Sequence, residues 1–226
     1  MINKYVIPTV FSSSYDDFLA RFKRVKAISS SIQIDFMDGI FVSSQSPKIK
    51  DIFDLKEFPQ IVFEAHLMYA NPKKFVQDCI DKGFKKIIFH YESQESPHEV
   101  HYMWLYIKKN GLIPVLALNP NTSADVLKDL PFVDFVLCMG VNPGKEKQVF
   151  IEDVYTKIAR IKKMYPHVLV QVDGGITESV AKELAQVGCD FINTGSFVSE
   201  SSNPLESLLK LETSFKEGLD KRGDLS

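Results

Sequence analysis

The sequence has no run of about 18 apolar residues, the length that a transmembrane helix needs, so a membrane partner is not expected. It has no excess of positive charge either, because 27 Lys and Arg residues are balanced by 29 Asp and Glu residues. Domains that bind nucleic acid are usually strongly basic, so nucleic acid is not an expected partner. No Ser/Gly-rich linker divides the 226 residues, which favours a single domain.

Cysteine is scarce. Cys79, Cys138 and Cys189 are odd in number and scattered, which favours buried, reduced side chains in a cytoplasmic protein. A catalytic thiol is left open, although no cysteine has a His partner motif. The segment 1–5 leads directly into a predicted strand and lacks the layout of a secretory signal peptide, so a cytoplasmic location is expected.

Apolar strands alternate with helical patterns along the whole chain, in eight units at fairly even spacing. The strands are near-continuous apolar runs, as parallel strands are when both of their faces are buried. This pattern predicts the α/β class and a single (β/α)8 TIM barrel over 1–218, followed by a polar, frayed tail over 219–226. The predicted strands are 5–11, 32–37, 60–68, 86–91, 112–118, 133–139, 168–172 and 190–194.

A doubly wound open sheet is the alternative fold. Such a sheet usually carries a glycine-rich dinucleotide signature after its first strand. The residues that follow the first predicted strand here, Val10-Phe11-Ser12-Ser13-Ser14, contain no glycine. The closed barrel is therefore the preferred prediction.

Ligand-type side chains stand at the C-terminal ends of three predicted strands: Asp35, His66 and Asp173. Catalytic residues of parallel barrels gather at this end of the strands. Two carboxylates on different sides of the barrel mouth could take a proton from one face of a carbon and return one to the other face, which inverts a stereocentre. Helix capping or pairing with a lysine is the alternative for either aspartate.

His66 has the same strand parity as Glu64, so the two side chains could point the same way. A lone histidine on an apolar strand is more often a satisfied core residue. Beside two strand-end aspartates, a role as metal ligand is at least as plausible. A divalent metal ion would stabilise the enediolate that forms when a proton leaves a carbon next to a carbonyl.

Two glycine turns, Gly174-Gly175 and Gly195-Ser196, follow the last two predicted strands. Loops at these positions of a barrel commonly bind phosphate through backbone N–H groups, and glycine allows phosphate to approach closely. Ordinary tight turns are the alternative.

Three methionines, Met37, Met68 and Met139, also fall at strand ends, where the residue type alone favours a role as core filler. The segment Lys145-Glu146-Lys147 is most simply a solvated loop. Its expected place over the barrel mouth would also suit a lid.

Taken together, several segments resemble the ribulose-phosphate 3-epimerase family, which shares the ribulose-phosphate-binding barrel. The resemblance covers nearly the whole chain. Its segments are Asp35-Phe-Met-Asp-Gly-Ile-Phe-Val42, His66-Leu-Met68 with Asn71-Pro72, Leu118-Asn-Pro-Asn-Thr122, Met139-Gly-Val-Asn-Pro-Gly144, Val172-Asp-Gly-Gly-Ile176 and Gly195-Ser196.

The resemblance implies an isomerase of the pentose phosphate pathway that interconverts D-ribulose 5-phosphate and D-xylulose 5-phosphate by inversion at C3. Asp35 and Asp173 would be the acid/base pair and would bind a divalent metal ion together with His66. The methionines would flank the planar enediolate, and the chain would form a homo-oligomer. The implied substrate-binding residues are Thr9, Met37, His66, Met68, Met139, Gly144, Gly174, Gly175, Gly195 and Ser196.

The sequence departs from the family's pattern at several places: Thr9 stands where the family has Ser, the Asn that usually follows Phe-Val-Pro is missing after Val42, and two larger departures affect the site. The family usually has His-x-Asp-x-Met-Asp-Gly on its second strand, and here Gln33 replaces the His. A Gln carbonyl oxygen can bind a hard cation but is a poor substitute for imidazole with zinc, iron or cobalt, so weaker metal binding or a different metal is expected. The family loop Pro-Gly-Phe-Gly-Gly-Gln is here Pro143-Gly-Lys-Glu-Lys-Gln148, where lysine could replace a lost backbone contact as a point charge.

Two alternatives to this function stay open. The chain could be an epimerase for another ketose phosphate. It could also be a non-catalytic paralogue that binds a phosphosugar.

Overall fold

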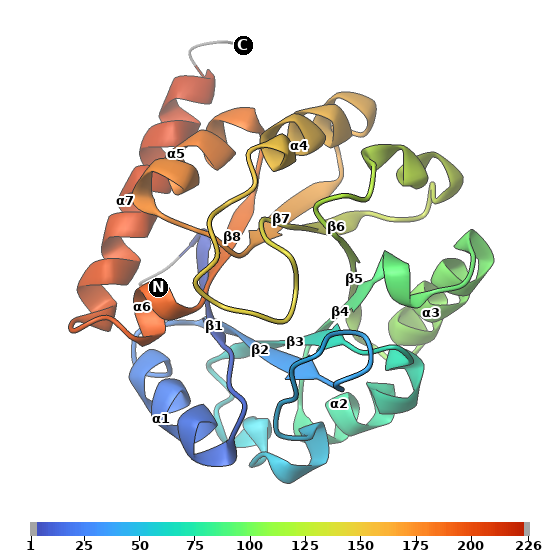
Figure 1. Cartoon of the computed structure of the whole chain (residues 1–226), viewed down its shortest axis with the longest axis vertical. Coiled ribbons are helices and arrows are strands. Elements are labelled where there is room, and N and C mark those ends of the chain that lie inside the picture. The colour runs from blue at the N-terminus through green and yellow to red at the C-terminus, as the bar shows by residue number, and fades with distance from the viewer. Residues whose placement is uncertain (1–3, 224–226) are drawn as a thin grey trace.

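Within the residues that the structure describes, eight parallel strands close into a barrel with helices around it (Figure 1). The computed structural model describes residues 4–223, so the start of the predicted domain at 1–3 and the end of the predicted tail at 224–226 lie outside it. Neighbouring strands pair in chain order, and the last strand pairs with the first. This closed order confirms the predicted (β/α)8 TIM barrel and contradicts the open sheet.

The elements follow the predicted alternation, and each strand begins and ends within two residues of its predicted bounds. The strands are β1 Val6–Val10, β2 Ser31–Met37, β3 Val62–Met68, β4 Lys86–His90, β5 Ile113–Leu118, β6 Phe135–Met139, β7 Leu169–Asp173 and β8 Phe191–Thr194. The α-helices are α1 Tyr15–Val25, α2 Val76–Lys82, α3 Pro97–Lys109, α4 Asp153–Met164, α5 Glu178–Val187, α6 Ser196–Ser199 and α7 Pro204–Gly223. Short 3-10 helices are η1 Ile49–Asp51, η2 Leu55–Glu57, η3 Pro72–Phe75, η4 Tyr91–Ser93 and η5 Ala124–Asp129.

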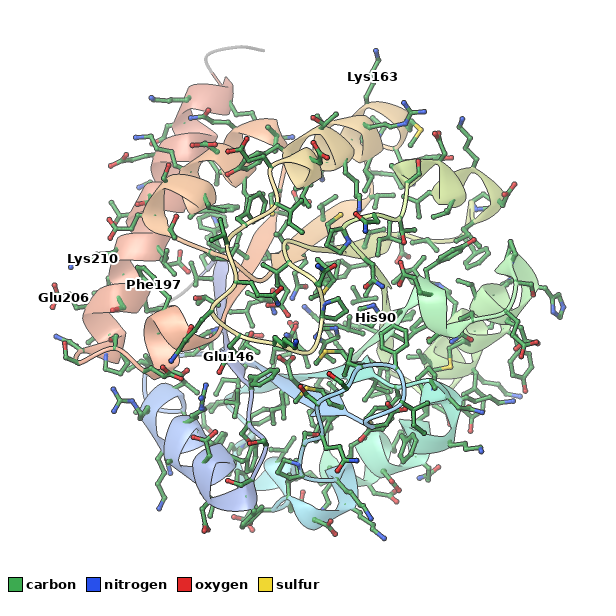
Figure 2. The ribbon with its side chains drawn as sticks, viewed as in Figure 1. His90, Glu146, Lys163, Phe197, Glu206 and Lys210 are labelled. Carbon is green, nitrogen blue, oxygen red and sulfur yellow. The ribbon has the colours of Figure 1, made fainter. Side chains whose placement is uncertain are left out.

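The outer helices are amphipathic, and α1 shows how they cover the barrel. Phe18, Phe22 and Val25 recur at helical spacing and are buried, as expected for the face that packs on the strands. Polar side chains of other helices, such as Lys163 and Glu206, point away from the barrel (Figure 2). The strands themselves are enclosed on both faces, which is why they read as unbroken apolar runs.

The structure corrects the predicted tail. Helix α7 continues to Gly223, so residues 219–223 of the predicted frayed tail are helical. A Cβ atom on Gly218 would lie 2.2 Å from the carbonyl oxygen of Lys182 and 2.7 Å from the Cβ of Ala185. Gly218 therefore allows α7 to pack closely on α5 instead of ending the helix. No helix among residues 4–223 is long and apolar enough to cross a membrane.

We expect Gly218→Ala to destabilise the protein, although alanine is normally more favourable than glycine inside a helix by about 1 kcal/mol. The added methyl would overlap the backbone of α5, and overpacking of this kind costs about 1–3 kcal/mol. Urea denaturation would measure the loss, with Lys216→Ala on an exposed position of the same helix as the control. A Gly218→Ala protein as stable as the parent would contradict the close contact.

All three cysteines, Cys79, Cys138 and Cys189, are buried and free of disulfides. Burial raises the pKa of the Cys138 thiol to about 12, so its reactive thiolate form is scarce at neutral pH. None of the three lines the pocket at the barrel mouth. The structure therefore agrees with buried, reduced cysteines and does not support a catalytic thiol.

Candidate functional site

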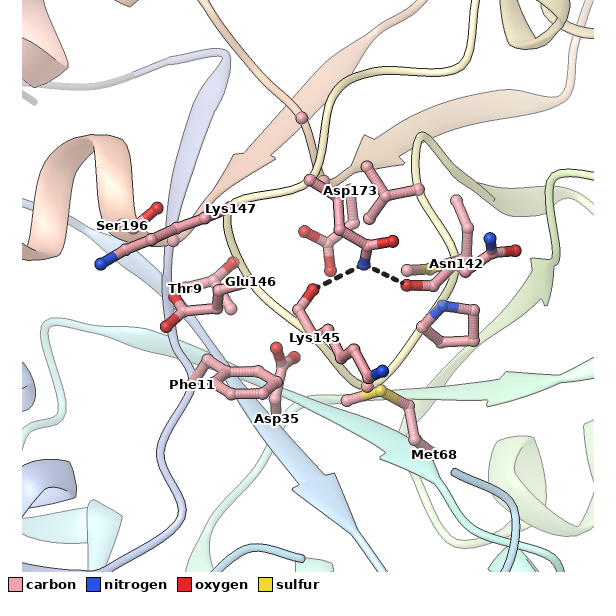
Figure 3. A pocket seen from close by; sticks show the side chains of 18 of the residues that line it. Thr9, Phe11, Asp35, Met68, Asn142, Lys145, Glu146, Lys147, Asp173 and Ser196 are labelled. Carbon is pink, nitrogen blue, oxygen red and sulfur yellow. Dashed lines mark hydrogen bonds between the residues drawn. The ribbon is translucent and has the colours of Figure 1, made fainter. Parts of the chain in front are cut away.

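A pocket lies at the C-terminal end of the barrel strands (Figure 3). The segment between β6 and α4 crosses the mouth of the barrel there (Figure 1). Most of the predicted site residues line the pocket: Thr9, Asp35, His66, Met68, Met139, Gly144, Asp173, Gly174, Gly175, Gly195 and Ser196. Two do not. Met37 packs in a buried cluster with Val42 and Met68, and Gln33 is fully buried.

Asp35, His66 and Asp173 come together from β2, β3 and β7 at the base of this pocket. His66 Nδ1 lies 3.0 Å from Asp35 Oδ1 and 3.5 Å from Asp173 Oδ2. The register of β2 and β3 places Asp35 directly beside His66, while the closed barrel brings Asp173 across from the distant β7. Both carboxylates contact His66 instead of a lysine or a helix end.

Burial and mutual contact shift the pKa values of two of these groups. Burial raises the pKa of Asp35 to about 6, against the opposing effect of its hydrogen bond to His66. Burial acts to lower the pKa of His66, but hydrogen bonds to Asp173 and Asp35 outweigh it and raise the pKa to about 9. The two shifts bring the pKa of Asp35 closer to neutral pH and favour the charged form of His66 beside the two carboxylates.

His90 and Glu92 extend the site behind His66, and sequence reasoning missed both. His66 Nε2 and His90 Nε2 are 2.9 Å apart, within hydrogen-bond distance. Burial lowers the pKa of His90, and the neighbouring His66 acts in the same direction. Glu92 lies 3.4 Å from the far ring nitrogen of His90 and accepts a hydrogen bond from the backbone N–H of Asn119. The available signal was a polar pair, His90 and Glu92, directly after the apolar run of β4.

Gln33 sits among the three side chains and contacts them through its amide nitrogen. Nε2 donates to Asp35 Oδ1 at 2.9 Å and to Asp173 Oδ2 at 2.7 Å, and the Gln33 oxygen accepts from Asn193 on the opposite side. Asp35, His66 and Asp173 offer ligand atoms within 4.8 Å of one another, so this group could hold a metal ion. The Gln33 NH2 group lies between the two carboxylates, however, so the residues as arranged do not fit a metal ion.

The glycine turns after β7 and β8 lie side by side and border a second hollow next to the pocket. Gly174 has φ +99°, a left-handed conformation that favours glycine, and a Cβ there would lie 2.4 Å from Val141. Gly175, Gly195 and Ser196 line both hollows. Backbone groups are therefore exposed to any ligand that enters between the two turns.

The segment 142–148 is held over the mouth by hydrogen bonds and ion pairs. Gln148 Nε2 donates to the carbonyl oxygens of Asn142 and Lys145 (dashed lines in Figure 3). Glu146 forms an ion pair with Arg21 of α1 at 2.9 Å, and its carboxylate lies beside Gly195. Of the two charged residues that replace the family's glycines, Glu146 is largely buried against the pocket, with its side chain 17% exposed. Lys147 borders the pocket with its side chain 68% exposed and pairs with Glu200.

The sequence model of the ribulose-phosphate 3 epimerase family matches residues 5–199. The chain belongs to this family. A ribulose-phosphate 3-epimerase from Helicobacter pylori strain J99 is 31% identical, over 88% of this chain and 92% of the relative. Another ribulose-phosphate 3-epimerase, from Eremothecium gossypii, is 28% identical over 99% of this chain and 98% of the relative. One from Synechocystis sp. is 31% identical over 94% of each chain. These matches confirm the resemblance predicted from the motifs.

Among solved structures, a thiamine phosphate pyrophosphorylase from Pyrococcus furiosus superposes with a TM-score of 0.63. The superposition covers 95% of this chain and 96% of the pyrophosphorylase chain, and the two sequences are 13% identical. This likeness shows the barrel fold alone.

Proposed function

We propose that the chain is a sugar-phosphate 3-epimerase that interconverts D-ribulose 5-phosphate and D-xylulose 5-phosphate. The family membership supports the substrate class. The observation that carries the reaction type is the pair of buried carboxylates, Asp35 and Asp173, bridged by one amide nitrogen at 2.9 Å and 2.7 Å. Two acid/base groups at one carbon are what inversion of a stereocentre requires.

The hydrogen on C3 is acidic because C2 is a carbonyl carbon. One aspartate would take this hydrogen as a proton, and the electron pair of the broken C3–H bond would form an enediolate with C2. The other aspartate, protonated beforehand, would give its proton to the opposite face of C3 and restore the carbonyl with inverted stereochemistry. A pKa of about 6 suits Asp35 for both directions, since proton transfer is most efficient when the pKa lies near the working pH.

Other residues of the pocket would bind and orient the substrate. The positive charge of His66 would lie near the enediolate as it forms. Met68 and Met139 would pack against its flat faces, with Met37 supporting Met68 from beneath. The remaining contacts, to the phosphate and the sugar hydroxyls, would come from Thr9, Gly144, Gly174, Gly175, Gly195 and Ser196.

The segment 142–148 would act as a lid over bound substrate. Arg21 holds the carboxylate of Glu146 at 2.9 Å, and this carboxylate lies beside Gly195, where the phosphate would bind. The ion pair would therefore offset the repulsion between a carboxylate and a phosphate dianion.

Arg21→Met should accordingly raise the KM for the sugar phosphate with little change in kcat. An increase of about tenfold corresponds to roughly 1.4 kcal/mol of lost binding. Steady-state kinetics would measure it, with Lys23→Met, an exposed position on the same helix, as the control. An unchanged KM would mean that Glu146 does not face the phosphate.

The pathway and the oligomeric state follow from the family, and the location follows from the sequence features described above. We propose a cytoplasmic homo-oligomer in the pentose phosphate pathway, with a phosphorylated ketose as its partner. Size-exclusion chromatography with light scattering would test the oligomeric state.

The proposed reaction is tested by NMR of the purified protein with D-ribulose 5-phosphate in deuterated water, with and without added manganese, zinc or magnesium. We expect D-xylulose 5-phosphate carrying deuterium at C3. Exchange with a different ketose phosphate only would favour the alternative substrate. Retention of sugar phosphate without any exchange would favour a binding protein and contradict the proposal.

A further inference from the structure

We propose that Gln33 takes the place of a metal ion in this site, so that the two aspartates are held together without a divalent cation. The catalytic role of this arrangement rests on the proposed epimerase function. The structural evidence is the hydrogen bonding of a set of buried amides, and the first test is metal binding, which does not depend on knowing the substrate.

The Gln33 amide nitrogen lies where the three ligand-type atoms converge. Nε2 is 2.9 Å from Asp35 Oδ1, 2.7 Å from Asp173 Oδ2 and 3.5 Å from His66 Nδ1. An amide NH2 group has two hydrogens to donate and accepts none, and it offers no ligand to a cation. Each carboxylate receives one hydrogen, and the space that an ion would need is filled.

The other end of Gln33 fixes this orientation through a ladder of amides. Gln33 Oε1 accepts from Asn193 Nδ2 at 2.7 Å. Asn193 Oδ1 accepts from Gln171 Nε2 at 2.6 Å, and the same nitrogen donates to Glu64 Oε2 at 2.8 Å. All four side chains are fully buried, so water does not compete for these contacts.

Glu64 sets the direction of the ladder. Its carboxylate pairs with Lys86 at 2.7 Å and can only accept hydrogen bonds, so the end of Gln171 that faces it must be NH2. Turning Gln33 over, so that its oxygen faced a cation, would set its NH2 against that of Asn193. Turning Asn193 as well would set its NH2 against that of Gln171. Turning Gln171 too would set an amide oxygen against the carboxylate of Glu64. Buried polar groups without partners are costly, so the ladder holds the Gln33 NH2 toward the aspartates.

Gln33 is therefore a positioning residue. Two carboxylates at one site repel each other, and a group that donates to both offsets the repulsion and sets their separation. A cation would meet the same requirement by charge, and Gln33 meets it by hydrogen bonds.

The test compares metal binding by the wild-type chain and by Gln33→Glu after dialysis against a chelator. The variant keeps the shape of the side chain but replaces the NH2 with an oxygen ligand, which suits Mn²⁺. We expect Mn²⁺ titration by electron paramagnetic resonance to show binding that is tighter in Gln33→Glu by at least about 10–100-fold, the range in which metal-site changes act. Gln60→Glu, an exposed position before β3, is the matched control and should bind Mn²⁺ no more tightly than the wild-type chain.

Two further variants keep the test decisive if Gln33→Glu folds poorly. Gln33→His should give the same gain with Zn²⁺, which prefers a nitrogen ligand. Asn193→Asp removes the donor that holds Gln33 Oε1 but still accepts from Gln171. Gln33 should then turn its NH2 toward residue 193 and its oxygen toward the carboxylates, so Mn²⁺ affinity should rise with Gln33 itself unchanged.

The proposal is overturned if the wild-type chain binds Mn²⁺ or Zn²⁺ stoichiometrically as tightly as these variants do. It is also overturned if chelation abolishes wild-type epimerisation and added metal restores it. Weak wild-type metal binding with strong binding by the variants supports it even if no ketose phosphate is turned over. In that last case the amide ladder stands and the proposed function fails.

Discussion

Replacement of Asp173 by Asn should abolish epimerisation while leaving the barrel folded. Asparagine has nearly the same shape, and its Oδ1 can still accept the hydrogen bond that Gln33 Nε2 donates at 2.7 Å. It cannot take or deliver a proton at C3. Loss of a general acid/base typically reduces the rate by about 10²–10⁴-fold, and loss of one of two obligatory groups should reach the upper end.

The pattern of residual proton exchange separates an acid/base role from a structural one. With Asp173 replaced, Asp35 still faces one side of C3, so slow deuterium exchange should persist in one epimer and vanish in the other. Asp35→Asn should show the opposite preference. NMR in deuterated water measures both, with Asp134→Asn, an exposed position, as the control. Equal loss of exchange in both epimers, with intact substrate binding, would argue that Asp173 only shapes the site.

The barrel and the gathering of Asp35, His66 and Asp173 could be predicted because each depends on local pattern. Parallel strands buried on both faces appear as apolar runs, and the rule that their C-terminal ends meet at one mouth needs no knowledge of contacts. The sequence alone therefore predicts that the polar side chains at those ends lie close together. The roles assigned to them remain predictions.

The orientation of Gln33 could not be predicted, because it depends on a partner 160 residues away. From the sequence, Gln33 was considered as a possible oxygen ligand, since an amide side chain can present either end. The choice is made by Asn193, Gln171 and Glu64, which lie on three other strands. A repeated signal was present: Gln33, Glu64 and Gln171 each stand two residues before a site residue, on the same face of their strands.

The close packing at Gly218 could not be predicted for a related reason. Glycine in a polar stretch is a common helix end, and the alternative, close packing against another helix, depends on the position of α5. The contact with Lys182 and Ala185 is visible only in three dimensions. Residue types predict local conformation better than they predict which surface a small residue will meet.

Lys86→Met should destabilise the whole barrel by about 3–5 kcal/mol, the cost of breaking a buried ion pair by removal of one partner. Glu64 is fully buried, and Lys86 Nζ is its neighbouring cation at 2.7 Å, with the lysine side chain 15% exposed. Methionine fills a similar volume but leaves the carboxylate uncompensated in the barrel interior. Urea denaturation followed by circular dichroism would measure the change in the free energy of unfolding.

Lys108→Met provides the comparison, because it breaks an ion pair with Asp134 in which both side chains are about half exposed. Pairs of that kind contribute about 0–1 kcal/mol, so this control should unfold nearly as the parent does. The double variant Lys86→Met with Glu64→Gln should recover most of the loss, since a neutral amide still accepts from Gln171 and leaves no buried charge. If Lys86→Met proved as mild as Lys108→Met, Glu64 would not be a firm anchor for the amide ladder. The orientation of Gln33 would then have to be fixed by the two aspartates alone.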